Sequence, residues 1–184
     1  MPRLLLAALA VAYLALASAT VRAAQDDPRL DALFDKLKSG SDEEARATER
    51  QIWQIWVAHK NPEIARLMQR GMAALNEDDP QEALDTFGQV VRADKNFAEG
   101  WNKRAAVEFV MGDFEASVAD IERTLQLEPH HFGALSGLGQ IYLALNKKAL
   151  ALKALSAALA VDPHLDGVRE KADELKKELE GSPI

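Results

Sequence analysis

The sequence predicts an all-α protein made of helix hairpins that pack in series. Three stretches of similar pattern open at Leu67, Trp101 and Leu135, each 34 residues after the one before. Each stretch holds two blocks with the apolar spacing of a helix, and a short turn signal separates the blocks. Because one hairpin of this length cannot bury its apolar face alone, we expect the three units to stack on one another.

The three units agree column by column in residue chemistry. The first and second helices each have a column of small residues, which lets two backbones approach closely, and the second helix has a large apolar column. Turn-forming residues stand at the break between the helices. The small columns are Gly71, Ala105, Gly139 and Ala83, Ser117, Ala151; the large column is Phe87, Ile121, Leu155; the turn column is Asp78, Gly112, Asn146.

The third unit carries a known signature at its proper spacing. Its residues are Leu135, Leu138-Gly139, Tyr142, Ala151, Leu155, Ala158 and Pro163. This pattern resembles the tetratricopeptide repeat family, and the resemblance covers about residues 64–165. It implies a right-handed α-solenoid in which the first helix of each repeat lines the concave side.

We divide the chain into four parts on these patterns. Residues 1–23 are expected to be a signal peptide, 24–61 an N-terminal helical hairpin, 62–165 three repeats, and 166–184 a C-terminal capping helix and tail. The repeats are expected at 64–97, 98–131 and 132–165.

The expected N-terminal hairpin has clear local signals. Leu30, Leu33, Phe34 and Leu37 form a helical apolar stripe, and Ser41 with Glu44 three residues later predicts a capping box that opens a second helix. We expect the hairpin to cap the first repeat. Its tryptophans, Trp53 and Trp56, either fill the seam against that repeat or form an aromatic partner site.

The first residues have the order of a secretory signal. Arg3 is followed by an apolar run over 4–17 and by the small residues Ala17-Ser18-Ala19, so cleavage after Ala19 or Ala23 is expected. An exported chain with no cysteine suits a bacterial periplasm, with no membrane association after cleavage. The alternative is an uncleaved N-terminal anchor in the inner membrane, facing the periplasm, although the run is short for a membrane span.

Composition argues against several classes of function. A net charge of −7 is unsuited to nucleic-acid binding, and the absence of cysteine removes thiolate zinc sites and a cysteine nucleophile. No zinc-protease motif, carboxylate pair or catalytic triad spacing is present, so we expect neither enzymatic activity nor a cofactor. His130, His131 and His164 fall in loops between repeats and are expected to be exposed, with no metal bound.

The resemblance implies a ligand groove along the first helices. The candidate residues are Met68, Met72, Asn102, Lys103, Phe109, Ser136, Gly137 and Gln140. The methionines and Phe109 would give apolar contacts, and the polar side chains would give hydrogen bonds. The columns that hold a carboxylate clamp in one subclass of the family contain Met68, Met72, Gly133 and Gly137 here, so that clamp is absent.

Two further features need an explanation. Gly133 and Gly137 weaken a helix by about 1 kcal/mol each, so they are either drift or positions that let a bound peptide approach. Arg104 and Glu108 lie on a helix face that should be interior. We expect them to pair, together with Asp120, as a structural ion pair rather than an active site.

The predicted function is therefore binding of a partner without catalysis. We expect a non-catalytic periplasmic interaction module or scaffold that binds a peptide or protein partner through the concave groove. The alternatives are a holdase-like chaperone for envelope proteins and a homo-oligomeric structural protein built through the end that carries Trp53 and Trp56.

Overall fold

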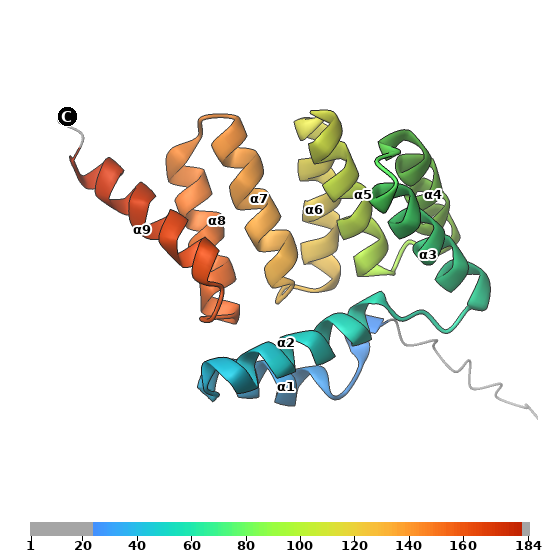
Figure 1. The fold of residues 1–184 in the computed structure, drawn as a ribbon, viewed down its shortest axis with the longest axis horizontal. Coiled ribbons are helices and arrows are strands. Elements are labelled where there is room, and N and C mark those ends of the chain that lie inside the picture. Colours follow the sequence, from blue (N-terminus) through green and yellow to red (C-terminus); the bar gives the residue numbers. More distant parts are fainter. Residues whose placement is uncertain (1–23, 182–184) are drawn as a thin grey trace, which may run out of the picture.

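The computed structural model describes residues 24–181, and within that range the chain forms one short 3-10 turn and nine α-helices (Figure 1). The predicted signal peptide lies outside the described residues. The elements are η1 (Ala24–Asp26), α1 (Leu30–Ser39), α2 (Asp42–Val57), α3 (Pro62–Asn76), α4 (Pro80–Ala93), α5 (Ala98–Met111), α6 (Phe114–Leu127), α7 (Phe132–Ala144), α8 (Lys148–Val161) and α9 (Asp166–Gly181).

The pairs α3/α4, α5/α6 and α7/α8 are the predicted repeat hairpins, and they stand side by side as a solenoid with α9 against α8 (Figure 1). Each hairpin turns at the predicted column. Asp78, Gly112 and Asn146 have φ values of 59°, 81° and 54°, a left-handed backbone that Gly, Asn and Asp adopt most readily. The all-α repeat fold predicted from the sequence is confirmed.

Small residues allow the two helices of a hairpin to touch. A Cβ added to Gly71 would lie 2.7 Å from the ring of Phe87, the large apolar residue of the same repeat. Phe87 is completely buried. The small and large columns are therefore complementary partners across each hairpin.

The helix starts follow the capping rules. Ser41 and Glu44 form the predicted capping box at the start of α2. Asn61, Asp79 and Asp113 cap α3, α4 and α6 through their side-chain oxygens.

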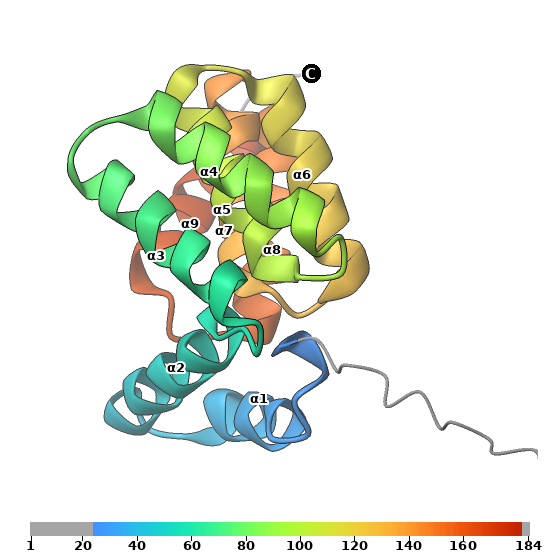
Figure 2. The ribbon, with the colours of Figure 1, turned by 90° about the vertical axis from the view of Figure 1, so that its right-hand side faces the viewer.

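The α1–α2 hairpin does not cap the first repeat. It lies across one end of the stacked helices, along the turns that connect successive repeats (Figures 1 and 2). Its apolar stripe joins a core cluster with Phe132 and Val161, which belong to the third repeat. The expectation that Trp53 and Trp56 fill a seam against the first repeat is therefore wrong.

The outer side of the first repeat explains this difference, because it is polar. Arg70 on α3 pairs with Glu82 on α4, and Arg66 pairs with Glu63 on the same helix. This end of the array is already solvated, as terminal repeats require. The apolar side of α2 is instead buried on the start of α7.

At the other end, α9 packs on α8 through Ala172 and Leu175 and exposes mostly charged side chains. Within residues 24–181, no helix combines the length and the apolar character needed to cross a bilayer.

Candidate interaction site

An aromatic cluster fixes α2 to the array. The ring of Trp53 makes edge contacts with Trp56, His131 and Phe132, at centroid distances of 5.3, 5.5 and 5.5 Å. The ammonium group of Lys103 on α5 lies 5.3 Å from the centre of the Trp53 ring. We call these five residues the seam cluster. It joins α2 to α5 and to the start of α7.

His131 is the polar centre of the seam cluster, and it is completely buried rather than exposed. Its Nδ1 accepts the backbone N–H of Ala134 at 3.1 Å and so caps α7. Nδ1 therefore carries no hydrogen, and Nε2–H donates to a Glu99 carboxylate oxygen 2.9 Å away. The expectation of an exposed loop histidine fails here because the α1–α2 hairpin covers this turn.

Glu99 is a fully buried carboxylate at the start of α5. It also accepts a hydrogen bond from Asn102 at 2.9 Å and pairs with Lys103 at 3.1 Å. Burial raises the pKa of Glu99, but the hydrogen bond from His131 and the charge of Lys103 more than offset this, so its pKa is held below the ordinary value. Two predicted groove residues are thus engaged with Glu99.

The other predicted groove residues do not form one continuous surface. Met68 is 1% exposed and lies in the core with Met72 packed against the same cluster, so Met68 offers no surface to a ligand. The ring of Phe109 packs on Phe114. Ser136 donates its hydroxyl hydrogen to the Phe132 carbonyl oxygen.

Gly133 and Gly137 have different surroundings. A Cβ added to Gly133 would lie 2.7 Å from the Trp53 ring, so the chain's own side chain occupies the space expected for a bound peptide. A Cβ on Gly137 would meet only Ile121, at an ordinary contact distance of 3.5 Å. Gly133 is thus explained by α2 packing, whereas Gly137 is not required by any close contact.

Gln140 is exposed and lines a cavity of about 570 Å³. We call this cavity the groove. Its walls are α2, α7 and α9, and its apolar lining is Leu143, Leu155, Leu165 and Val168. Its polar lining includes Arg46, Glu49, Gln140 and Lys171.

Sequence reasoning missed the α2 wall of this groove. Arg46 and Glu49 lie on the polar face of an amphipathic helix, and nothing in their spacing distinguishes them from other surface charges. At the start of this wall, an exposed hydrogen bond of 2.8 Å joins Asp42 to His164 in the turn before α9.

A larger hollow of about 810 Å³ lies on the hairpin itself. It is lined by η1, α1, α2 and the chain that follows, with Leu33 and Ile55 among its apolar residues. None of its lining residues comes from a repeat. We therefore take the smaller groove, which includes repeat residues, as the candidate interaction site.

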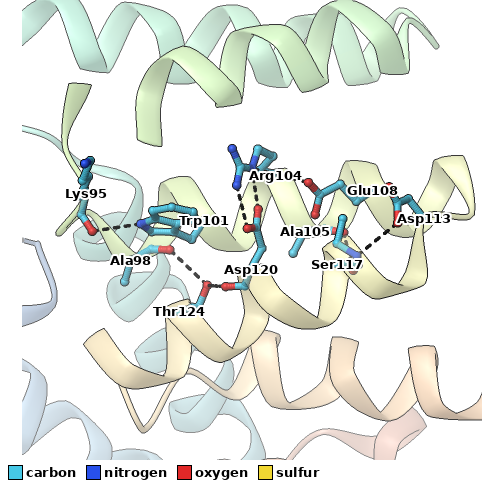
Figure 3. A network of polar contacts seen from close by, with 11 residues as sticks. Lys95, Ala98, Trp101, Arg104, Ala105, Glu108, Asp113, Ser117, Asp120 and Thr124 are labelled. Atoms are coloured by element: carbon cyan, nitrogen blue, oxygen red, sulfur yellow. Dashed lines mark hydrogen bonds and ion pairs between the residues drawn. The ribbon is translucent and has the colours of Figure 1, made fainter. Parts of the chain in front are cut away.

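The predicted ion-pair network between α5 and α6 is present (Figure 3). The Arg104 guanidinium donates two hydrogen bonds to the Asp120 carboxylate, at 2.6 and 2.8 Å, and its Nε lies 3.6 Å from Glu108. Burial, followed by the charge of Asp120, raises the pKa of Glu108 to about 7. None of the three residues lines either cavity, so the network holds two helices together.

Comparison with known proteins agrees with this architecture. Residues 133–165 match the family model described as tetratricopeptide repeat. A TPR repeat-containing protein of Rhizobium etli is 36% identical over 155 residues, which make up 84% of this chain and 76% of that protein. The chain therefore belongs to the tetratricopeptide repeat proteins.

Solved structures share the fold at low sequence identity. The TPR domain of Sgt2 from Aspergillus fumigatus superposes with a TM-score of 0.61 at 21% identity, over 67% of this chain and 87% of that one. The first TPR of Spaghetti (RPAP3), bound to an HSP90 peptide, has a TM-score of 0.61 at 20% identity, over 64% and 94%. MamA has a TM-score of 0.55 at 19% identity and covers more of this chain, 85%, and 92% of its own.

Proposed function

We propose that the protein is a non-catalytic interaction module of the bacterial periplasm that binds a peptide or protein partner in the groove between α2, α7 and α9. The observation that carries this proposal is the groove itself. It combines an apolar floor with a few polar groups, the usual composition of a recognition site. Its Gln140 and Leu143 come from the first helix of a repeat, on the concave side where partners of this family are expected.

The sequence supports the periplasmic location. The first residues have the basic, apolar and small-residue order of an export signal, and the chain has no cysteine. The described helices are too short or too polar to span a membrane. Fractionation of cells that produce the full chain, with detection by antibody, tests this part of the proposal; recovery with cytoplasmic markers would contradict it.

The alternatives have less support. A holdase-like chaperone needs exposed apolar surface, but Met68, one of the apolar residues expected in the ligand groove, is buried in the core. A homo-oligomer built through the two α2 tryptophans would need their rings to be available, and both rings pack inside the same chain.

Photo-crosslinking in living cells tests the proposed groove. A photoreactive residue in place of Gln140 should give a crosslinked partner band on irradiation. The matched control is Gln89, an exposed glutamine on the outer helix α4. Equal crosslinking from Gln89 and Gln140, or none from Gln140, would contradict the groove as the interaction site.

A further inference from the structure

The large apolar side chains that are exposed gather on one side of the array. Among residues 24–181 they are Val110, Met111, Leu145, Leu150 and Leu179, and Val110 is the most exposed, at 66%. They stand at the ends of α5, α7 and α9 and near the start of α8. These helix ends lie on the side away from the α1–α2 hairpin (Figures 1 and 2). We call this side the turn edge, because the turns at residues 77–79, 112–113 and 145–147 lie along it.

The apolar residues of the turn edge are not spread evenly over the repeats. Met111 and Leu145 hold equivalent positions in the second and third repeats, where the first repeat has Glu77. Single exposed apolar residues are ordinary on a protein surface, but a group confined to neighbouring turns indicates a surface that a partner covers. The turns of the second and third repeats are therefore the part of the turn edge that we expect to be covered.

The third turn also carries a lysine that local structure does not explain. Asp79 and Asp113 cap α4 and α6 through their side chains, whereas Lys147 stands at the equivalent position before α8 and provides no side-chain cap. A lysine is unfavourable there, because it leaves helix N–H groups without a cap and adds positive charge to the positive end of the helix dipole. A carboxylate from a partner would correct both defects.

The second turn offers such a carboxylate. Glu115 is exposed in the first turn of α6, and neither its carboxylate nor the ammonium group of Lys147 has an ion pair or hydrogen bond with residues 24–181. The neighbouring Lys148 is already paired with Glu178 of α9. The second turn is thus apolar and acidic, and the third is apolar and basic.

The two turns are complementary in charge, but within one chain they stand side by side. A second copy rotated by 180° about an axis between them would place the second turn of each copy against the third turn of the other. A twofold contact of this kind forms the same complementary pair twice. A partner with charge of a single sign would instead be repelled by one of the two turns.

We propose that the protein forms a twofold dimer through the turn edge. In this dimer Glu115 of one protomer binds Lys147 of the partner subunit, and the exposed apolar residues of the two turns pack between these ion pairs. The contact lies on the side opposite Trp53 and Trp56. None of its residues lines the groove between α2, α7 and α9, so the dimer is independent of the proposed function.

Sedimentation equilibrium over a range of concentrations tests the dimer, with the protein purified as the producing cells process it. Lys147→Glu and Glu115→Lys should each weaken the dimer at least about tenfold, because each change alters two symmetric ion pairs. The variant with both changes should regain the affinity of the wild type, since opposite charges face each other again. The matched control is Lys153→Glu, an exposed lysine in the middle of α8, which should leave the affinity unchanged.

A further variant tests the apolar part of the contact. Val110→Ser should weaken the dimer and leave the thermal unfolding of the dilute monomer unchanged, because this side chain is already exposed to water in the monomer. The unfolding of the charge-reversed variants, measured in the same way, shows whether they are folded.

Three results would overturn the proposal. The first is a wild type that stays monomeric at about 1 mM, where even a weak dimer is populated. The second is a dimer that neither charge reversal weakens or that the double variant does not restore, because another surface then forms it. The third is growth beyond a dimer, because a twofold contact is closed.

Discussion

The indole ring of Trp56 lies flat on the imidazole ring of His131, with 4.0 Å between the ring centres and 12° between the planes. Trp56 belongs to the N-terminal hairpin, and His131 caps the first helix of the third repeat. The stack therefore connects the N-terminal hairpin to the third repeat, two parts of the chain for which the repeat pattern predicts no contact. Its strength decides how firmly α2 forms one wall of the groove.

Replacement of Trp56 should destabilise the whole protein. Trp56 is 1% exposed, so Trp56→Ala leaves a large cavity and should lower the free energy of unfolding by about 3–5 kcal/mol in urea denaturation. The matched control is Trp101→Ala, because Trp101 is only partly buried on α5 and should lose clearly less. Equal losses in the two variants would contradict the role given to the stack.

The two glycines of α7 should respond in opposite directions to alanine. Gly133→Ala places a Cβ against the Trp53 ring, which Trp56, His131 and Phe132 surround, and should cost about 1–2 kcal/mol of stability. Gly137→Ala has room for its methyl group and should gain up to about 1 kcal/mol from helix propensity. Thermal unfolding of both variants measures the difference. If Gly133→Ala stabilised the protein, the Trp53 ring would not be held tightly against this position, and the prediction would be wrong.

Arg104 should contribute to stability chiefly by neutralising the buried carboxylate of Asp120. Asp120 is 5% exposed, so Arg104→Leu leaves a buried carboxylate without its partner and should cost about 3 kcal/mol in urea denaturation. The third repeat shows which residues can replace the pair, because it has Leu138 at the position of Arg104 and Ala154 at the position of Asp120. The double variant Arg104→Leu with Asp120→Ala should recover most of the loss. A neutral Arg104→Leu variant would refute the structural role of the pair.

Glu108 should make stability depend on pH in the neutral range. Its pKa is raised from 4.5 to about 7, so the native state favours the protonated form. Stability that is present at low pH is therefore lost as pH rises from 4.5 to about 7, and the penalty is constant above that range. Glu108→Gln removes this penalty. It should be more stable than the wild type at pH 8 by about 1–2 kcal/mol, after allowance for solvent screening.

The measurement is the free energy of unfolding of both proteins at pH 5, 6, 7 and 8. Glu108→Gln should show a flatter dependence between pH 5 and 7. If the two proteins change in parallel over this range, the proton on Glu108 is not the cause.

Local patterns were sufficient for much of the fold. The repeat period located the hairpins, and the positive φ values fall on Asp78, Gly112 and Asn146, as turn chemistry requires. The contact between Arg104 and Asp120 was also predictable, because a charged residue on the interior face of α5 requires a charged partner, and Asp120 lies on α6 of the same hairpin. These features depend on neighbours within one repeat, which a periodic sequence reveals.

The position of the hairpin was not predictable in the same way. The apolar stripe of α2 predicts that one side of the helix is buried, but it does not identify the surface on which that side packs. The repeat pattern did not predict that His131 is buried. The equivalent positions in the other repeats, Phe97 and Leu165, are apolar and precede helices, so they do not point to a covered histidine. Gly133 was a sign of close packing in the sequence, and the side chain that lies against it is Trp53.

The hydrogen bond between Asp42 and His164 joins residues 122 positions apart. In most arrays each unit touches only its neighbours, so an end unit can fray while the remainder stays folded. Here the α1–α2 hairpin also packs on the third repeat through Phe132 and Val161, so more than the neighbouring repeat holds that unit in place. The chain should therefore lose its structure in one cooperative step, with amide hydrogens in the first and last repeats exchanging at similar rates.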